Sequence, residues 1–309
     1  MLIPNAVILP LSLLTDRLIG DPVSRYHPVA FIGSFIGWWG RPSIWPDRFQ
    51  RSAGVVMWLV TVLLFALPFL LASWLLPWYL LLLAGPLLLK CCLAWRSLEE
   101  HVAAVNEALA RDVSEGQKTA SFMVSRDTTT LTSEQVRSAA YESMAENLVD
   151  SIVSPIFYFG LFGLPGAAVF RAANTMDAML GYQDERKLIG WWSARIDDIL
   201  NFIPARIAGG MLLVYFAMQG RFPYAYRGLQ RDRKKRPGIN GGIPMSIIAS
   251  GVGVRFEKPG VYVMGTGERS LEEAGSEIVK AIRVVTVTLG ALISMVLILL
   301  GSGIIYTGI

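Results

Sequence analysis

No charged residue interrupts the chain from residue 54 to residue 89. As a single helix this stretch would extend about 54 Å at 1.5 Å per residue, whereas the hydrocarbon core of a bilayer is about 30 Å thick. The stretch therefore predicts two membrane spans, near residues 54–75 and 77–95. Pro77 and the two aromatic residues after it supply a turn with side chains suited to the membrane surface.

Apolar runs near the two ends of the sequence predict two further spans. Residues 284–305 are uncharged and rich in Leu, Ile and Val. Residues 2–19 begin with an apolar run that lacks the basic start and the small-residue cleavage site of a signal peptide. We therefore expect this first segment to be retained as a span.

Two weaker apolar segments lie in the middle of the chain. Residues 152–170 are interrupted by three glycines and a proline, and residues 199–218 contain Pro204 and Arg206. An arginine at the centre of a membrane helix costs roughly 2.5 to 3.5 kcal/mol on insertion scales, so Arg206 should face protein or a water-filled cavity. We expect both segments to be broken or re-entrant helices that line a polar site, because irregular backbone at membrane depth needs such surroundings.

Composition agrees with this pattern. With 53% hydrophobic and 17% charged residues, the chain is predicted to be all-α, a polytopic integral membrane helical bundle that forms one membrane-embedded domain over residues 1–309. The net charge is +4, and seven basic residues lie between positions 221 and 236. By the positive-inside rule they place the loop 219–283 in the cytoplasm. No aromatic-basic motif accompanies them, so we expect no nucleic-acid partner.

Familiar catalytic motifs are absent from the sequence. It contains no Gly-rich phosphate loop, no dinucleotide fingerprint, no H-E-x-x-H and no G-x-S-x-G. Its only cysteines, Cys91 and Cys92, are adjacent, which excludes a disulfide framework and a cysteine zinc site. Any nucleotide chemistry must therefore use another kind of site.

Between residues 121 and 201, charged and amide side chains recur at helical spacing among apolar neighbours. Glu142, Glu146 and Asp150 are spaced by four, so on a helix they form one carboxylate stripe, with Asn147 beside it. Like charges at this spacing repel, so solvent, arginines or a divalent cation must offset them. Mg²⁺ is typically bound by one or two carboxylates together with substrate phosphates, whereas a stripe that stands alone is more often a solvated helix face.

Two more polar stripes follow. Arg171, Asn174 and Asp177 share one helix face. The run SARIDDILNFIPARI adds acids, an amide and guanidinium groups, namely Arg195, Asp197, Asp198, Asn201 and Arg206. These groups are suited to holding phosphates, and structural ion pairs within a helix bundle are the alternative. Three successive polar helices in an apolar chain favour a site.

Two shorter polar segments lie outside these stripes. In SRDTT, Arg126 and Asp127 either cap a helix that begins near Ser133 or bind a ligand. In GDPVSRYHP, Asp21 and His27 lie in a segment that prolines constrain, which is either a plain turn or part of a site.

Six blocks of the sequence, in order and nearly end to end, resemble the CobD/CbiB membrane proteins of cobalamin biosynthesis, the adenosylcobinamide-phosphate synthases. The blocks are GDPVSRYHPVAFIG, SRDTTTL, ESMAENLVDSIVSPIFYF, GLPGAAVFRAANTMDAMLGYQDER, GWWSARIDDILNFIPARI and RDRKKRPGINGGIP. The chain departs from the family pattern after Arg236, where a histidine and an SPN..WPE-like stretch usually follow. Asn240 is retained, but Met245 stands where an acid is common.

The resemblance implies an ATP-dependent amide ligase. It would join the free carboxylate of adenosylcobyric acid to the amine of (R)-1-amino-2-propanol phosphate or a related amino alcohol, giving adenosylcobinamide phosphate. ATP would convert the carboxylate to an acyl phosphate that the amine attacks, and such chemistry needs Mg²⁺, cationic clamps and a base. The implied partners are these corrinoid and amino alcohol phosphate substrates and membrane lipid. Association with other enzymes of nucleotide-loop assembly, or with further copies of the chain, stays open.

On this resemblance we predict roles for the polar residues. Glu142, Glu146, Asp150, Asp177 and His27 are predicted to be catalytic, and Glu142, Glu146 and Asp177 are also predicted to bind the metal. The predicted substrate-binding residues are Asp21, Arg126, Asp127, Asn147, Arg171, Asn174, Tyr182, Glu185, Arg195, Asp197, Asp198, Asn201, Arg206 and Asn240.

Two other functions also fit a buried site of acids and arginines. A transporter would bury Arg206 and Asp177, and a lipid-linked phosphotransferase would pair acids with Mg²⁺ near a membrane. The lack of internal repeats speaks against the first, and the lack of the known transferase motifs against the second. The ligase requires every polar block to face the cytoplasm at the cell membrane, where ATP is, so we predict that residues 152–170 and 199–218 do not cross fully.

Overall fold

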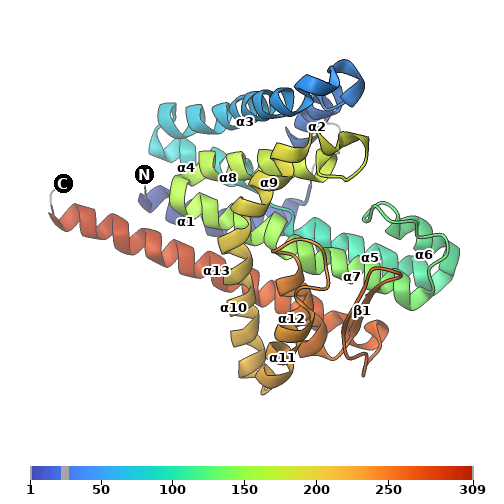
Figure 1. Cartoon of the computed structure of the whole chain (residues 1–309). Helices are drawn as coiled ribbons and strands as arrows, with labels where there is room; N and C mark the ends of the chain where they lie inside the picture. Colours follow the sequence, from blue (N-terminus) through green and yellow to red (C-terminus); the bar gives the residue numbers. More distant parts are fainter. Residues whose placement is uncertain (1, 22–27, 308–309) are drawn as a thin grey trace. The chain divides into compact units, whose positions relative to one another are not determined.

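The structure is a computed structural model that describes residues 2–21 and 28–307, and the chain there is almost entirely helical (Figure 1). It divides into two compact units. Unit 1 comprises Met1–Ala94, Ser154–Asn201 and Leu289–Ile309, and unit 2 comprises Trp95–Val153 and Phe202–Thr288. The single membrane-embedded domain expected from the sequence stays a prediction.

Unit 1 is a group of helices packed around α8. Its elements are α1 (Leu2–Ile19), α2 (Pro28–Trp39), two short 3-10 turns (Pro42–Ile44 and Asp47–Phe49), α3 (Gln50–Leu75), α4 (Trp78–Lys90), α8 (Ser154–Leu180), a 3-10 turn (Glu185–Lys187) and α9 (Trp191–Leu200). Helix α8 packs against α1, α2, α3, α4 and α9. The last part of α13 (Leu271–Thr307) also belongs to this unit from Leu289 onward.

Helices α3 and α4 form the predicted hairpin (Figure 1). The turn is at Pro77, which precedes the first residue of α4. Leu83 is 72% exposed, as expected of a side chain that faces lipid, while Trp74 and Trp78 beside the turn are 78% and 65% exposed. Tryptophans at such a turn are typical of the membrane–water interface.

Helix α8 is broken near its middle, as the sequence predicted. Gly163 has φ 67° and ψ −155°, a backbone conformation outside the helical region. Only glycine adopts it without strain, because a side chain would clash with the neighbouring backbone. Gly166 also allows a close approach, since a Cβ at this position would lie 2.4 Å from the carbonyl oxygen of Tyr158.

Unit 2 is built around α12 (Gly242–Val252), every residue of which is buried. Its other elements are α5 (Trp95–Arg111), α6 (Val113–Ala120), α7 (Ser133–Leu148), a π-helix (Val149–Val153), α10 (Phe202–Met218), α11 (Phe222–Asp232), the strands β1 (Arg255–Lys258) and β2 (Tyr262–Gly265), and the first part of α13. A helix that is apolar all round belongs in the interior, and α7, α10, α11 and both strands pack against α12. The two strands pair antiparallel, with Phe256 opposite Met264.

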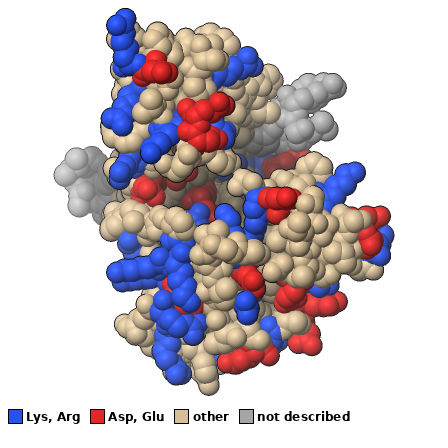
Figure 2. Space-filling view, turned by 45° about the vertical axis from the view of Figure 1, so that its right-hand side comes forward, with Lys and Arg blue, Asp and Glu red and all other residues tan. Residues whose placement is uncertain are grey.

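Within the described residues, five helical stretches are long and apolar enough to cross a membrane. They are Leu2–Ile19, Asp47–Leu75, Trp78–Arg111, Ser133–Leu180 and Leu271–Ser302, and α9 and α10 meet the criterion only when taken together. The protein is therefore an all-α polytopic helical membrane protein, as predicted. Charged side chains gather in groups on its surface, and the basic ones are most crowded in the lower part of Figure 2.

Candidate functional site

Helix α7 carries the carboxylate stripe and begins at Ser133, where the sequence predicted. Thr132 is its N-cap: its hydroxyl accepts a hydrogen bond from the Gln135 amide, and the Gln135 side chain accepts one from the Thr132 amide. This reciprocal capping satisfies two backbone donors that the first turn of a helix leaves open. Most of α7 is buried, so its polar side chains need partners inside the protein.

Glu142 on α7 is only 3% exposed. Ser138, one turn earlier, donates a hydrogen bond to Glu142 Oε1, and the Tyr262 hydroxyl donates to Oε2 over 2.6 Å. Arg126 Nη2 lies 3.2 Å from the same Oε2. We call Glu142, Arg126, Ser138 and Tyr262 the glutamate network. A buried carboxylate is tolerated where charge and hydrogen bonds compensate it, and here both do.

The hairpin of β1 and β2 docks on this network through its backbone. The Glu257 amide donates to Ser138 Oγ over 2.7 Å, and Arg126 Nη1 donates to the Glu257 carbonyl over 3.2 Å. Burial, and after it the Glu142 carboxylate, raise the pKa of Tyr262 above its ordinary value. Tyr262 is therefore a protonated donor at physiological pH.

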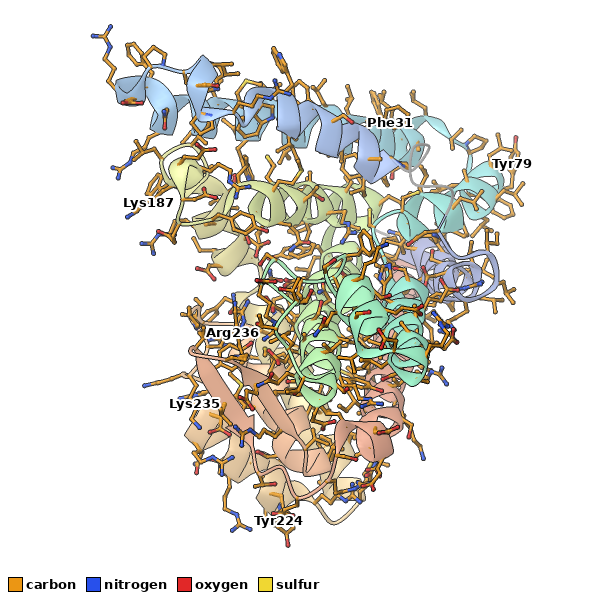
Figure 3. All side chains as sticks on the ribbon, turned by 90° about the vertical axis from the view of Figure 1, so that its right-hand side faces the viewer. Phe31, Tyr79, Lys187, Tyr224, Lys235 and Arg236 are labelled. Carbon is orange, nitrogen blue, oxygen red and sulfur yellow. The ribbon has the colours of Figure 1, made fainter. Side chains whose placement is uncertain are left out.

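Glu146, the next acid of the stripe, pairs with Arg236 from the loop before α12. Figure 3 labels Arg236. The Glu146 side chain is 33% exposed and that of Arg236 is 24% exposed. Two different arginines thus offset the repulsion between Glu142 and Glu146. These carboxylates would fit a metal ion only by giving up arginine partners. No group of three or more His, Cys, Asp or Glu side chains in the described part of the chain is placed to hold one. The assignment of Mg²⁺ to Glu142, Glu146 and Asp177 stays a prediction.

The stripe changes beyond Glu146, where α7 gives way to the π-helix Val149–Val153. Asn147 donates to the Ser143 carbonyl over 2.9 Å and accepts from the Ser151 hydroxyl over 3.2 Å. Asp150 lies in the wider π-helical turn, so the regular four-residue stripe predicted for three acids ends with Glu146. A π-helical turn within an α-helix is frequent at functional sites.

Arg206 and Asn240 form a third polar contact in unit 2. Arg206 Nη1 donates to the Phe202 carbonyl over 2.7 Å and to Asn240 Oδ1 over 3.0 Å. The guanidinium carbon lies 3.5 Å from the centre of the Phe202 ring. Arg206 therefore has polar protein partners but is itself exposed, and the expectation that it faces protein or a water-filled cavity stays a prediction.

In unit 1, a second network surrounds Asp197 of α9, which is 7% exposed. Asn174 Nδ2 donates to Asp197 Oδ1 over 3.2 Å, and Asn201 Nδ2 donates to Asp197 Oδ2 over 2.8 Å. Ser154, the first residue of α8, donates in turn to Asn201 Oδ1. We call these four residues the aspartate network. It brings together residues that the sequence placed on two separate polar helices.

Asp177 follows Asn174 of the aspartate network by three residues on α8, so the two share one face of this helix. Its side chain lies against Gly181, where a Cβ would come within 2.1 Å of Asp177 Oδ1. A larger residue at position 181 would therefore displace this carboxylate. Arg171 and Asp198 are half-buried on α8 and α9.

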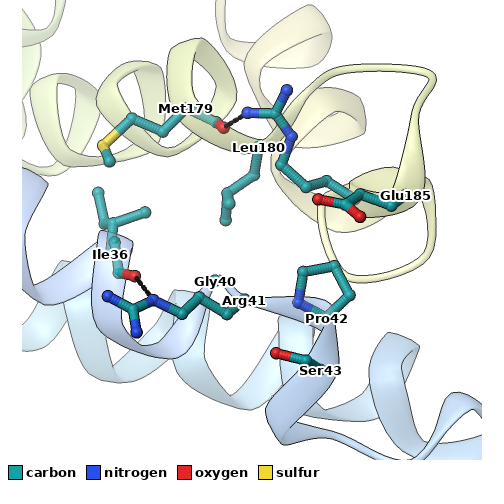
Figure 4. Close-up of a pocket in the computed structure, with 10 residues that line it drawn as sticks. Ile36, Gly40, Arg41, Pro42, Ser43, Met179, Leu180 and Glu185 are labelled. Carbon is teal, nitrogen blue, oxygen red and sulfur yellow. Dashed lines mark hydrogen bonds between the residues drawn. The ribbon is translucent and has the colours of Figure 1, made fainter.

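The loop after α8 holds Tyr182 and Glu185. The Arg186 guanidinium lies over the Tyr182 ring, 4.1 Å from its centre, and its Nη1 donates to the Met179 carbonyl over 2.9 Å. Glu185 and Arg186 line a cavity of about 320 Å³ whose opposite wall comes from the end of α2 and the turn after it (Figure 4). Of the predicted site residues that the structure describes, Glu185 alone lines this cavity.

Three predicted residues remain among those that the structure describes, namely Asp21, Asp127 and Arg195. Asp21 forms an ion pair with the buried lysine that ends α4. Asp127 accepts hydrogen bonds from the amide and the hydroxyl of Thr129, and these bonds lower its pKa. This pattern identifies Asp127 as a turn residue. Arg195 is exposed on α9. His27 lies outside the described residues.

Four residues of the two networks and of the Glu146 ion pair were not predicted from the sequence, namely Ser138, Ser154, Tyr262 and Arg236. Ser138 precedes Glu142 by one helical turn, so helical spacing was a usable signal. Tyr262 reaches Glu142 from a hairpin 120 residues away and carries no local signal. The charge of Arg236 was assigned to membrane topology, with phosphate binding of the basic cluster as the alternative, and neither explanation indicated its pairing with Glu146.

Long apolar helices that carry buried polar networks define the class of this molecule: a polytopic helical membrane protein with polar sites built into its helices. Comparison with protein families narrows the class, because residues 9–289 match the family described as CobD/Cbib protein. The chain belongs to this family, and it is a CobD-family protein of cobalamin biosynthesis.

Individual relatives cover most of the chain. The "Probable cobalamin biosynthesis protein CobD" of Methanothermobacter thermautotrophicus is 40% identical over 260 residues, covering 84% of this chain and 86% of that protein. A protein of the same name from Pyrococcus abyssi is 42% identical over 265 residues, covering 83% and 84%. The "Cobalamin biosynthesis protein CobD" of Dehalococcoides mccartyi is 34% identical over 272 residues, covering 86% and 88%. No solved structure matches the chain.

Proposed function

We propose that the protein is an ATP-dependent amide ligase at the cytoplasmic face of the cell membrane. It joins the carboxylate of adenosylcobyric acid to the amine of (R)-1-amino-2-propanol phosphate, or a related amino alcohol, and gives adenosylcobinamide phosphate. Membership of the CobD/Cbib family supports the pathway. The observation that carries the proposal is the Glu146–Arg236 pair, an acid and a guanidinium group that are both partly open to solvent.

The chemistry explains why such a pair is needed. A carboxylate oxygen of the corrinoid acid attacks the γ-phosphorus of ATP, ADP leaves, and an acyl phosphate forms. The amine nitrogen then attacks the acyl carbon and phosphate leaves. Because the amine is protonated at neutral pH, it must lose one proton before attack and a second as the amide forms, and a positioned carboxylate can accept a proton. Mg²⁺ bound with ATP would offset phosphate charge.

Glu146 suits the role of base better than Glu142 does. Glu142 is almost fully buried, and both of its oxygens already accept hydrogen bonds. It therefore holds Arg126 and Tyr262 in place, which makes it a positioning residue. Glu146 is exposed enough to meet a substrate, and Arg236 beside it offers a cation for a carboxylate or phosphate. The proposal thus narrows the sequence prediction, in which both acids are catalytic.

The test uses the purified full-length protein in detergent micelles with ATP, Mg²⁺, adenosylcobyric acid and the amino alcohol phosphate. ADP release should require both substrates and should match the amount of amide product found by mass spectrometry. E146Q should lose about a hundredfold or more of the rate, as expected on removing a general base, while its melting temperature stays near that of the wild type.

Glu115 offers a matched control, because it also pairs with an arginine, Arg111, but at an exposed position. E115Q should keep the wild-type rate. ADP release that does not depend on the corrinoid acid, or full turnover by E146Q, would contradict the proposal. Accumulation of a solute in vesicles without ATP turnover would instead favour a transporter.

A further inference from the structure

Unit 1 contains a cavity of about 320 Å³ between the end of α2, with the turn after it, and the end of α8, with the loop after it (Figure 4). This volume lies at the lower end of the range of small-molecule sites, about 300 to 1,000 Å³. Apolar side chains of α2 and α8 form one part of the lining, and Arg41, Ser43, Glu185 and Arg186 supply polar groups. These polar groups decide what the cavity can bind.

Arg186 is neutralised within its own loop. Its Nε donates to Asp184 Oδ1 over 3.0 Å, and its Nη1 donates to the Met179 carbonyl over 2.9 Å. The guanidinium also lies over the Tyr182 ring, 4.1 Å from its centre. Arg186 therefore forms part of the wall and, together with Asp184, adds no net charge.

Two opposite charges of the cavity have no such compensation. Among the described residues, Arg41 forms one hydrogen bond, from Nε to the Gly37 carbonyl over 3.0 Å, so both of its Nη groups are open. The Glu185 carboxylate has no hydrogen bond or ion pair with any described residue, only a longer-range attraction to Arg186. An exposed charge by itself needs nothing but water. Here the two charges come from facing walls of one cavity (Figure 4), which therefore offers a cation and an anion to the same ligand.

The cavity lies where two stretches that are long and apolar enough to cross a membrane end. The stretch Asp47–Leu75 begins after one wall of the cavity, and the stretch Ser133–Leu180 ends before the other. Trp38 and Tyr182, which are close to lining residues in the sequence, are 59% and 38% exposed. Exposed aromatic rings at span ends are typical of the membrane–water interface, the level of the lipid headgroups. Basic pockets between membrane helices bind phosphate headgroups at this level.

We infer that the cavity binds an aminoalkyl phosphate, a compound with an ammonium group and a phosphate a few bonds apart. The Nη groups of Arg41 donate to the phosphate oxygens, and the Glu185 carboxylate accepts hydrogen bonds from the ammonium group. The headgroup of phosphatidylethanolamine carries both groups, and so does a free amino alcohol phosphate. The position at the span ends favours the lipid headgroup. The inference does not depend on the ligase reaction.

Native mass spectrometry of the full-length protein, released from detergent micelles, tests the inference without turnover. The probes are phosphatidylethanolamine, phosphatidylcholine with the same acyl chains, and (R)-1-amino-2-propanol phosphate. Phosphatidylcholine keeps the phosphate but has methyl groups in place of the ammonium hydrogens, so it cannot donate to Glu185. The wild type should therefore bind phosphatidylethanolamine about tenfold more tightly than phosphatidylcholine. Tighter binding of the free phosphate than of either lipid would identify the soluble compound as the ligand.

Substitutions at the two charges should act differently. R41Q should weaken both lipids about tenfold, because both carry the phosphate, whereas E185Q should remove the preference for phosphatidylethanolamine and leave phosphatidylcholine unchanged. G37L tests the cavity itself without a change of charge. A Cβ at Gly37 would lie 3.9 Å from Met179 Cε, an ordinary contact, so a leucine side chain fits on α2 and occupies cavity volume. It should weaken every probe.

Arg48 provides the matched control. It is exposed in the same connection between α2 and α3, but its guanidinium lies over the Phe49 ring, 4.7 Å from its centre, away from the lining of the cavity. R48Q should bind each probe like the wild type, and a melting curve would confirm that each variant is folded.

Three results would overturn the inference. They are a wild-type protein that binds neither phosphatidylethanolamine nor the free phosphate more tightly than phosphatidylcholine, unchanged binding in R41Q and E185Q, and equal weakening in R48Q, which would assign the effect to positive charge at the membrane surface. R41Q and E185Q remove one hydrogen bond at most, so they keep the test valid if G37L does not fold. Loss of the ligase reaction with intact binding would remove the proposed function and leave this site standing.

Discussion

The Tyr262 hydroxyl donates a hydrogen bond to Glu142 over 2.6 Å, across 120 residues of sequence. The contact joins a two-stranded hairpin to the middle of a buried helix. Because the two partners come from distant parts of the chain, the bond forms only when unit 2 has folded around α12. Its loss therefore reports on the packing of that unit and not on local helix structure.

Replacing Tyr262 by Phe should destabilise the protein without changing its charge. The variant leaves a buried carboxylate with one donor fewer, at a cost of about 1 to 3 kcal/mol. Thermal unfolding in detergent micelles should show a melting temperature several degrees lower. Tyr224, which is 54% exposed, provides the control, and Y224F should melt like the wild type. A Y262F protein with the melting temperature of the wild type would mean that Arg126 and Ser138 suffice to hold Glu142.

A double-mutant cycle should show that Arg126 and Glu142 stabilise the fold as a pair. Removing either partner leaves the other charge buried, which typically costs about 3 to 5 kcal/mol, so R126Q and E142Q should each be strongly destabilising. The double variant should cost clearly less than the sum, by more than about 1 kcal/mol in denaturant unfolding.

The exposed pair of Arg111 and Glu115 serves as the control cycle. Its side chains are 64% and 52% exposed, and the two residues lie on either side of the junction between α5 and α6. Coupling there should be no more than about 0.5 kcal/mol. Simple additivity in the Arg126–Glu142 cycle would show that the pairing of these two charges contributes nothing to stability.

Features that depend on neighbouring residues were predictable from the sequence. The turn at Pro77, the break in α8 at Gly163 and the start of α7 at Ser133 all follow from local backbone chemistry. Each is set by a proline, a glycine or a capping residue that acts within one helical turn. Apolar length likewise predicted four of the five helical stretches that are long and apolar enough to cross a membrane. The fifth, Ser133–Leu180, contains the segment 152–170, which was expected not to cross fully.

Features that depend on distant partners were not predictable. Residues 219–283 were expected to form a basic loop, yet they contain α11, the buried α12 and the hairpin. Helix α12 is apolar but has only 11 residues, too few to cross a bilayer, so its sequence alone does not distinguish a buried helix from a loop. The hairpin then supplies Tyr262 to Glu142, a contact that helical spacing cannot indicate.

Close packing of α11 on α12 predicts a strong effect at Gly228. A Cβ at this position would lie 2.1 Å from Ser250 Oγ and 2.8 Å from the Ser246 carbonyl oxygen, so G228A forces the two helices apart. Overpacking of this kind costs about 1 to 3 kcal/mol. At Gly210 on α10, a Cβ would meet nothing within 4 Å, and G210A should instead stabilise its helix by about 0.5 to 1 kcal/mol. Equal melting temperatures for the two variants would contradict this packing.

Acid should weaken unit 2 through Asp232, which is fully buried and accepts hydrogen bonds from Arg231, Lys235 and the Gly265 amide. Burial alone would raise the pKa of Asp232, but the three donors outweigh it and lower the pKa from 3.8 to about 2. Because the folded-state pKa lies below the unfolded value, the carboxylate stabilises the fold fully above about pH 4. This contribution, at most about 2 kcal/mol, is lost as the pH falls toward 2. The test measures melting temperatures from pH 7 to pH 2. At pH 7, D232N should melt at a lower temperature than the wild type, and its melting temperature should fall less steeply with acid. The control E107Q, at an exposed position, should follow the wild type. A D232N protein with the wild-type slope would assign the acid sensitivity to other carboxylates.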